Sequence, residues 1–171
     1  MNEIIANEDE IHAALERIAE QLRPVVAGQT TAFIGLKSVG DMVAERLVTL
    51  LAEDDTATLL LGALDVSLYR DDLTRFTDNP SLQGTEIDFD LDDTHVILVD
   101  DVLYTGRTVR AALDAITDYG RPSKIELAIL VDRGGRELPI HPNYVGINLA
   151  PSAAGNIKVS LGGEEESVSL T

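Results

Sequence analysis

Residues 96–108 read Val-Ile-Leu-Val-Asp-Asp-Val-Leu-Tyr-Thr-Gly-Arg-Thr, and this string is the most informative one in the sequence about the fold. Its apolar start predicts a strand over residues 95–99, followed by a loop over 100–107 and a helix over 108–118 that ends at Gly120. A buried strand that ends in two carboxylates and turns into a helix is typical of parallel α/β proteins. In such proteins ligands bind at the carboxyl ends of the strands.

The turn itself has the chemistry of a phosphate site. Gly106 lets the backbone approach an anion, Thr105 and Thr108 offer hydroxyl donors, and the helix start adds positive potential. Asp100 and Asp101 suit ribose hydroxyls. Taken separately, an acidic pair is more often a helix cap and Thr-Gly a generic turn. The acidic magnesium site of a response-regulator receiver domain is a rival, but that pair lies near the chain start, whereas this one lies past the middle.

The flanking segments alternate between strand and helix patterns. We predict an α/β fold with a central, mostly parallel sheet flanked by helices, formed by one domain over residues 1–171. The polar, acidic end, residues 162–171, is expected to fray. Apolar residues at helical spacing place a first helix between Asn7 or Asp9 as the cap and Pro24 as the stop. The other predicted elements are a strand over 31–36, a loop over 37–40, a helix to Leu51, strands over 58–68 and 124–131, and a long loop or two edge strands over 69–90.

Composition narrows the classes of function. The chain has 171 residues, 44% of them hydrophobic, and lacks a run of about eighteen apolar residues, so we expect a cytoplasmic protein that does not enter membranes. Cysteine is absent and the three histidines are scattered, which argues against a structural zinc site. A formal net charge of −17 disfavours binding to DNA or to bulk RNA. Seven of the 13 basic residues nevertheless lie in or beside four loops: Lys37, Arg70, Arg75, Arg107, Arg110, Arg133 and Arg136.

The string at 96–108 resembles the signature for phosphoribosyl pyrophosphate (PRPP) in type I phosphoribosyltransferases. The wider sequence, over roughly residues 5–160, is similar to the PyrR family of uracil phosphoribosyltransferases and pyrimidine-operon attenuation regulators. Two further segments carry the likeness: Ser-Leu-Tyr-Arg-Asp-Asp-Leu at 67–73 and Val-Asp-Arg-Gly-Gly-Arg-Glu-Leu-Pro-Ile at 131–140. The resemblance implies the type I fold with a small hood and a flexible loop.

The resemblance also implies roles for particular residues. Asp100, Asp101 and Arg70 would form the catalytic set, and Mg²⁺ would be held mainly through PRPP oxygens and water rather than by a protein metal site. The 5′-phosphate and ribose would contact Asp100, Asp101, Val102, Leu103, Tyr104, Thr105, Gly106, Arg107 and Thr108. Pyrophosphate would lie on Leu36, Lys37, Ser38, Val39 and Gly40, the flexible loop would include Tyr69, Arg70, Asp71, Asp72 and Arg75, and the base would meet Val131, Asp132 and Arg133.

Each cation also has an ordinary structural interpretation. Arg70 and Arg75 are equally well explained as solvated loop arginines or as side chains that close over pyrophosphate. Lys37, beside Gly35 and Gly40, is better placed for a ligand. Arg133 is favoured over Arg136, for which an ion pair with Glu137 or another acid is a serious alternative.

The resemblance implies synthesis of UMP from uracil and PRPP by a homodimer or a larger homo-oligomer. The alternatives are a UMP-responsive RNA attenuator with weak or no transferase activity, and a catalytically weak nucleotide sensor. Many relatives have an Arg at the position of Val39, so a cation near pyrophosphate is missing. The first helix has Glu16 and Glu20 beside Arg17 and Arg23, and residues 141–148 contain no Lys or Arg, so we expect poor binding of pyrimidine leader mRNA.

Overall fold

The protein is built on a five-stranded parallel sheet with the strand order β3-β2-β4-β5-β6. The computed structural model describes residues 3–67, 84–151 and 155–171. Its central strands are buried on both faces and read as continuous apolar runs, as parallel strands do. The strands are β2 (Thr30–Leu36), β3 (Thr58–Leu64), β4 (His95–Leu103), β5 (Lys124–Asp132) and β6 (Tyr144–Asn148).

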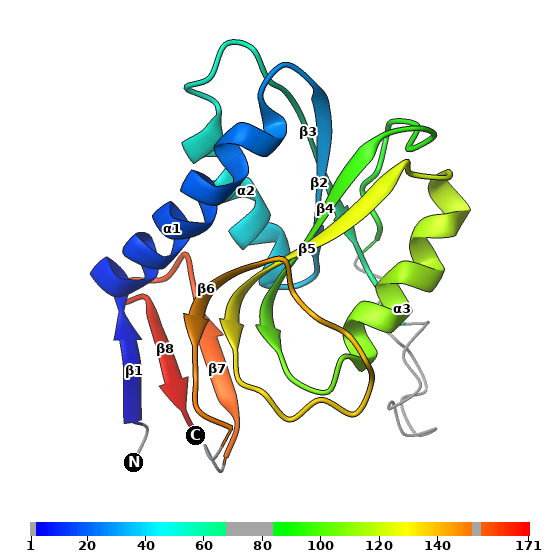
Figure 1. The fold of residues 1–171 in the computed structure, drawn as a ribbon. Coiled ribbons are helices and arrows are strands. Elements are labelled where there is room, and N and C mark those ends of the chain that lie inside the picture. The colour runs from blue at the N-terminus through cyan, green and yellow to red at the C-terminus, as the bar shows by residue number, and fades with distance from the viewer. Residues whose placement is uncertain (1–2, 68–83, 152–154) are drawn as a thin grey trace.

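Helices cover both faces of this sheet (Figure 1). Helices α1 (Glu8–Val26) and α2 (Gly40–Leu51) pack on one face, and α3 (Arg107–Ile116) with a short 3₁₀ turn (Thr117–Tyr119) packs on the other. Each face therefore has its own apolar core. The α/β architecture with a parallel sheet that the sequence predicts is confirmed.

Helix α1 begins at the predicted cap but ends later than predicted. The Asn7 side chain accepts from the Glu10 N–H at 3.0 Å, and the Glu10 carboxylate accepts from the Asn7 N–H at 2.9 Å, which is a capping box. The prediction that Pro24 stops the helix is wrong, because the helix continues to Val26. Proline in the last turn removes only one backbone hydrogen bond, and the packing of Leu22 and Val26 in the core continues the helix.

Strand β4 is longer than the sequence suggests. Residues 100–103 were expected to form the start of a loop, but they continue the ladder with β5, where Asp100 lies opposite Ile129 and Leu103 opposite Asp132. The two carboxylates therefore stand on a rigid strand end rather than on a loop. The helix that follows starts at Arg107, one residue earlier than expected.

A second, antiparallel sheet forms a hood beside the main one, at the lower left of Figure 1. It consists of β1 (Glu3–Asn7), β7 (Ile157–Ser160) and β8 (Ser167–Leu170), in the order β1-β8-β7. The expectation that residues 162–171 fray is therefore wrong. Val168 is buried, and both guanidinium nitrogens of Arg46 on α2 bind the Glu166 carboxylate, which holds this end against the main body.

A buried polar cluster lies at the edge of the parallel sheet where its strands begin. Glu126 lies 2.9 Å from the Nε2 of His95, accepts from the Tyr144 hydroxyl at 3.1 Å, and lies 3.1 Å from the ammonium of Lys124. Burial, together with the hydrogen bond to Glu126, raises the pKa of Tyr144 to about 12. The cluster ties the starts of β4, β5 and β6 together.

Between β3 and β4 the structure describes residues 65–67 and 84–94. Strand β3 ends at Leu64 rather than near 68, and Ala63 exchanges two backbone hydrogen bonds with Glu86 at 3.0 and 2.7 Å. Most of the predicted loop lies outside the described residues. No helix within residues 3–67, 84–151 and 155–171 has the length and apolar character needed to cross a membrane.

Candidate active site

The predicted ligand segments meet at the carboxyl edge of the parallel sheet, at its lower end in Figure 1. Residues 37–39 follow β2, residues 104–106 follow β4, and residues 133–143 follow β5. Because the carboxyl ends of parallel strands lie on one edge, these three loops are neighbours.

The turn between β4 and α3 forms a small pocket. Gly106 has φ +94°, a conformation that favours glycine, and a Cβ there would lie a tight 3.0 Å from Cγ1 of Ile140. Helix α3 starts at the next residue and offers its first N–H groups to the same place. The cavity has a volume of about 200 Å³ and is lined by Asp100, Val102, Leu103, Tyr104, Thr105, Gly106, Thr108 and Val109. Of the predicted residues 100–108, only Asp101 and Arg107 are not among its lining.

The acidic pair lies against the start of α2. Asp100 is buried and its Oδ1 accepts from the Asp101 N–H at 2.9 Å, whereas Asp101 is half-buried. A Cβ on Gly40 would lie 2.8 Å from the Val99 carbonyl oxygen and 3.0 Å from Oδ1 of Asp100. Glycine at position 40 therefore lets the β2–α2 loop approach Asp100 closely.

The predicted pyrophosphate loop connects β2 to α2. Its Lys37–Ser38 peptide bond is cis, and the Lys37 N–H donates to the Leu64 carbonyl oxygen at 3.0 Å. The Lys37 side chain is only 13% exposed, and its ammonium lies 3.6 Å from the Glu86 carboxylate. Val39 is the residue that caps α2, and it packs against the core on the α1 and α2 face.

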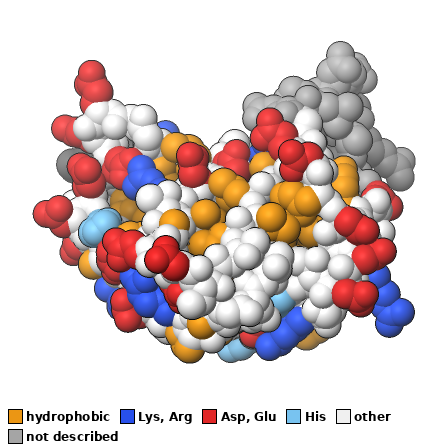
Figure 2. Space-filling view, turned by 90° about the horizontal axis from the view of Figure 1, so that it is seen from above, with side chains coloured by type: hydrophobic (Ala, Val, Ile, Leu, Met, Phe, Trp, Pro, Cys, Tyr) orange, Lys and Arg blue, Asp and Glu red, His pale blue; other side chains and the backbone are white. Residues whose placement is uncertain are grey.

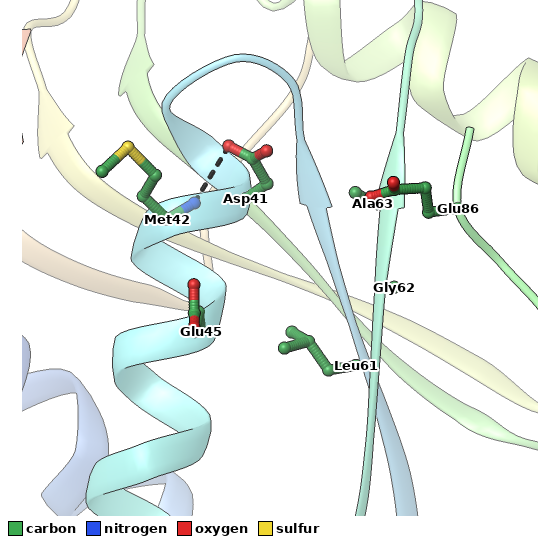
Figure 3. Close-up of a pocket in the computed structure, with 7 residues that line it drawn as sticks. All are labelled: Asp41, Met42, Glu45, Leu61, Gly62, Ala63 and Glu86. Carbon is green, nitrogen blue, oxygen red and sulfur yellow. Dashed lines mark hydrogen bonds between the residues drawn. The ribbon is translucent and has the colours of Figure 1, made fainter. Parts of the chain in front are cut away.

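A second pocket, of about 220 Å³, lies beside this loop between α2 and β3 (Figure 3). Its lining carries three carboxylates, which makes it a poor site for a phosphate. Figure 3 shows Asp41 and Glu45 on the α2 side and Glu86 beyond β3. The full lining is Asp41, Met42, Glu45, Leu61, Gly62, Ala63 and Glu86.

The predicted base-binding segment at the end of β5 contains an ion pair. Asp132 binds Arg136 through two hydrogen bonds of 2.9 and 2.7 Å, so the interpretation of Arg136 as an ion-pairing residue is confirmed, with Asp132 rather than Glu137 as its partner. Arg133 instead stacks on the Tyr104 ring, 4.0 Å from its centroid. Val131 is fully buried, so its side chain supports the strand rather than a ligand.

The loops after β4 and β5 are joined along a continuous seam, which sequence reasoning missed. The N–H groups of Glu137 and Leu138 donate to the Thr105 carbonyl oxygen at 3.0 and 3.1 Å. Arg107 binds Glu137 at 2.8 Å, so this arginine is engaged at the outer side of the turn. The only sequence signal for the seam is the Gly-Gly step at 134–135, where both φ angles are positive.

The predicted flexible loop cannot be placed, because Tyr69, Arg70, Asp71, Asp72 and Arg75 lie outside the described residues. Within the described ranges, no group of three or more His, Asp or Glu side chains is arranged to hold a metal ion. The cations brought to the carboxyl edge are Lys37, Arg107, Arg133 and Arg136.

Comparison with known proteins agrees with this geometry. A family model described as Phosphoribosyl transferase domain matches residues 2–161. The bifunctional protein PyrR of Deinococcus radiodurans is 51% identical over 158 residues, covering 92% of this chain and 86% of that protein. Its counterpart in Akkermansia muciniphila is 47% identical over 159 residues, covering 93% and 89%.

Solved structures give the same fold. The hypoxanthine phosphoribosyltransferase of Trypanosoma cruzi superposes with a TM-score of 0.72 at 17% identity and covers 98% of this chain and 95% of that one. The hypoxanthine phosphoribosyltransferase of Staphylococcus aureus superposes with a TM-score of 0.68 at 18% identity, and the match covers 88% of this chain and 79% of that one. The likeness to these enzymes concerns the fold alone, whereas the sequence matches to PyrR are far closer. The chain therefore belongs to the phosphoribosyl transferase domain family and, within it, to the PyrR proteins.

Proposed function

We propose that the chain is a uracil phosphoribosyltransferase, which forms UMP and pyrophosphate from uracil and PRPP. The observation that carries the proposal is the meeting of a phosphate-sized pocket, two strand-end carboxylates and the β2–α2 loop at one sheet edge, in a member of the PyrR family. Each of these parts fits one part of PRPP.

The fit suggests how PRPP is oriented. The 5′-phosphate lies in the pocket at 105–108, where the start of α3 supplies N–H donors. Asp100 and Asp101 accept hydrogen bonds from the ribose hydroxyls, and the β2–α2 loop, with Lys37, faces the pyrophosphate. A uracil nitrogen then attacks the anomeric carbon as the bond to pyrophosphate breaks, and the nitrogen loses its proton. The leaving oxygen takes the electron pair, so positioning and charge stabilisation suffice without a covalent enzyme intermediate.

Magnesium is part of the same proposal. When bound, Mg²⁺ neutralises charge on the pyrophosphate oxygens. The carboxylates of Asp100 and Asp101 are the hard oxygen donors that this ion prefers, and Asp100 adjoins the β2–α2 loop at Gly40. Because the described residues hold no group of three or more His, Asp or Glu side chains arranged for a metal ion, PRPP oxygens and water supply the remaining ligands.

The second candidate function is RNA-dependent attenuation, because the similar PyrR proteins are described as bifunctional. Charge argues against strong RNA binding. On α1, Arg17 donates to the Gly146 carbonyl oxygen at 2.7 Å and Arg23 binds Glu20 at 2.9 Å, so both arginines are engaged within the protein. On the face in Figure 2, Asp and Glu side chains surround a hollow with an apolar floor. A phosphate backbone is repelled by such a surface.

We also propose that the chain self-associates, as the resemblance to the PyrR family implies. Sedimentation velocity should give a mass above the 18.4 kDa of one chain, and a monomeric mass would contradict the proposal.

The enzyme proposal is tested by mixing the purified chain with Mg²⁺, PRPP and each of uracil, orotate, hypoxanthine, guanine and adenine. Chromatography should show a nucleotide with uracil alone, and Asp101→Asn should lower the rate by about 100-fold or more. Asp55→Asn, the same change in the loop between α2 and β3, is the matched control. Turnover with another base only, or with none, contradicts the proposal. Tight, UMP-dependent binding of the pyrimidine leader RNA without turnover supports the attenuator instead.

A further inference from the structure

Arg136 joins two loops of the candidate site, the segment that follows β5 and the turn that follows β4. It lies in the segment between β5 and β6 and its side chain is 22% exposed. Its Nε donates to the Ile140 carbonyl oxygen at 2.9 Å, and its Nη1 donates to the Tyr104 carbonyl oxygen at 3.1 Å. The same guanidinium binds both oxygens of Asp132.

The ion pair uses the Asp132 carboxylate fully. Oδ1 accepts from both Arg136 and the Gly134 N–H at 3.0 Å, and Oδ2 accepts from Arg136 at 2.7 Å. Burial favours the protonated acid, but the hydrogen bonds from Arg136 and Gly134 outweigh it and lower the pKa of Asp132. This carboxylate, at 15% exposure, therefore orders its own loop.

The residue held from the other side is Tyr104, which precedes the phosphate turn. Its carbonyl accepts from Arg136, Arg133 stacks on its ring, and a Cβ on Gly135 would lie 2.4 Å from its Cε2. Three neighbours in the segment 133–136 thus surround Tyr104, which lines the phosphate pocket with Thr105 and Gly106.

We propose that Arg136 is a positioning residue that fixes the base-binding loop relative to the 5′-phosphate loop. The inference rests on the proposed function and adds to it a residue that acts through Asp132 and Tyr104 without touching the ligand. A nucleotide carries its base and its phosphate at a set separation, so it binds both loops only when they are held in register. A sugar phosphate without a base uses the phosphate loop and the strand-end carboxylates but not the base-binding loop.

The test compares UMP with ribose 5-phosphate by calorimetry on the full chain. The wild type should bind UMP more tightly than ribose 5-phosphate, and Arg136→Ala should weaken the binding of UMP by about 10- to 100-fold. The affinity for ribose 5-phosphate should change by no more than about twofold, since this ligand does not span the two loops. Arg136→Lys keeps the charge but not the two-pronged geometry, so it should fall between these values.

Arg46→Ala is the matched control, because it removes another paired arginine, the partner of Glu166, away from the carboxyl edge. It should lower the unfolding temperature and leave the ratio of the two affinities unchanged. The proposal is overturned if Arg136→Ala weakens both ligands equally or neither, or if Arg46→Ala changes the ratio as much. A wild type that does not prefer UMP also overturns it. Failure of the proposed function appears separately, as absent turnover with uracil, while the binding ratio still reports on Arg136.

Discussion

The ammonium of Lys37 lies close to the exposed carboxylate of Glu86, which under the proposed function would compete with pyrophosphate. Glu86, 3.6 Å away, competes with the ligand for this cation, although its 74% exposure keeps the competition weak. We expect Glu86→Gln to lower the KM for PRPP by about two- to threefold, with the KM for the base unchanged. Steady-state kinetics with each substrate varied in turn measures this, and a raised KM for PRPP would show that Glu86 holds Lys37 in its productive position.

Val39 gives a second prediction for a single residue. It caps α2 at the end of the pyrophosphate loop, where its side chain is half-buried and makes no capping hydrogen bond. Val39→Arg adds a long cation that can reach solvent beside the leaving group, so kcat/KM for PRPP should rise about 10-fold or more. Val39→Met, an uncharged long side chain, is the control. An equal gain in both variants would attribute the effect to shape instead of charge.

At the scale of single residues, the sequence allows prediction where the residues concerned are neighbours along the chain. Asp100, Thr105 and Gly106 lie in one unbroken string and line one pocket in the structure, whereas Asp101 is not among its lining; their role in binding a ligand stays a prediction. The partner of Arg136 could not be chosen in advance, because nearby acids are available in sequence and only the turn at Gly134 and Gly135 selects Asp132.

Among the elements, the hood is held to α2 by the pair of Arg46 and Glu166. The Arg46 hydrogen bonds, helped by the Gly162 N–H and opposed by burial, lower the pKa of Glu166 to about 2 from 4.5. A lowered folded-state pKa means that the stabilisation is present above pH 4.5 and is lost as pH falls toward 2. Glu166→Gln should cost about 1–3 kcal/mol at neutral pH. The difference from wild type in urea unfolding should shrink between pH 4.5 and 3, and a pH-independent difference would contradict this assignment.

The elements that were not predicted from the sequence lack a strong local pattern. Strands β1, β7 and β8 have only 4 or 5 residues each, which is too short for a clear pattern, and β1 pairs with β8 at the other end of the sequence. The extension of β4 was missed because two adjacent carboxylates resemble a loop. The long apolar runs, by contrast, were predicted because burial on both faces leaves a strong local pattern.

For the whole molecule, charge is the dominant feature. With 30 acidic and 13 basic residues, self-repulsion opposes the compact state, and salt screens it. We expect the unfolding temperature to rise by several degrees, about 2–5 °C, between 0.1 and 2 M KCl. Sucrose of matched osmolality is the control for general exclusion effects. A falling unfolding temperature would show that the ion pairs outweigh the repulsion.

The pairing of β1 with β8 bears on the order in which the chain assembles during synthesis. Glu3 lies opposite Leu170, so β1 leaves the ribosome long before its partner strand exists. The parallel sheet, whose neighbouring strands are closer in sequence, can form first, and closing the longest loop comes last. We therefore expect β1 to remain unpaired after the parallel sheet has folded. The hood should be the last part of the nascent protein to become resistant to protease.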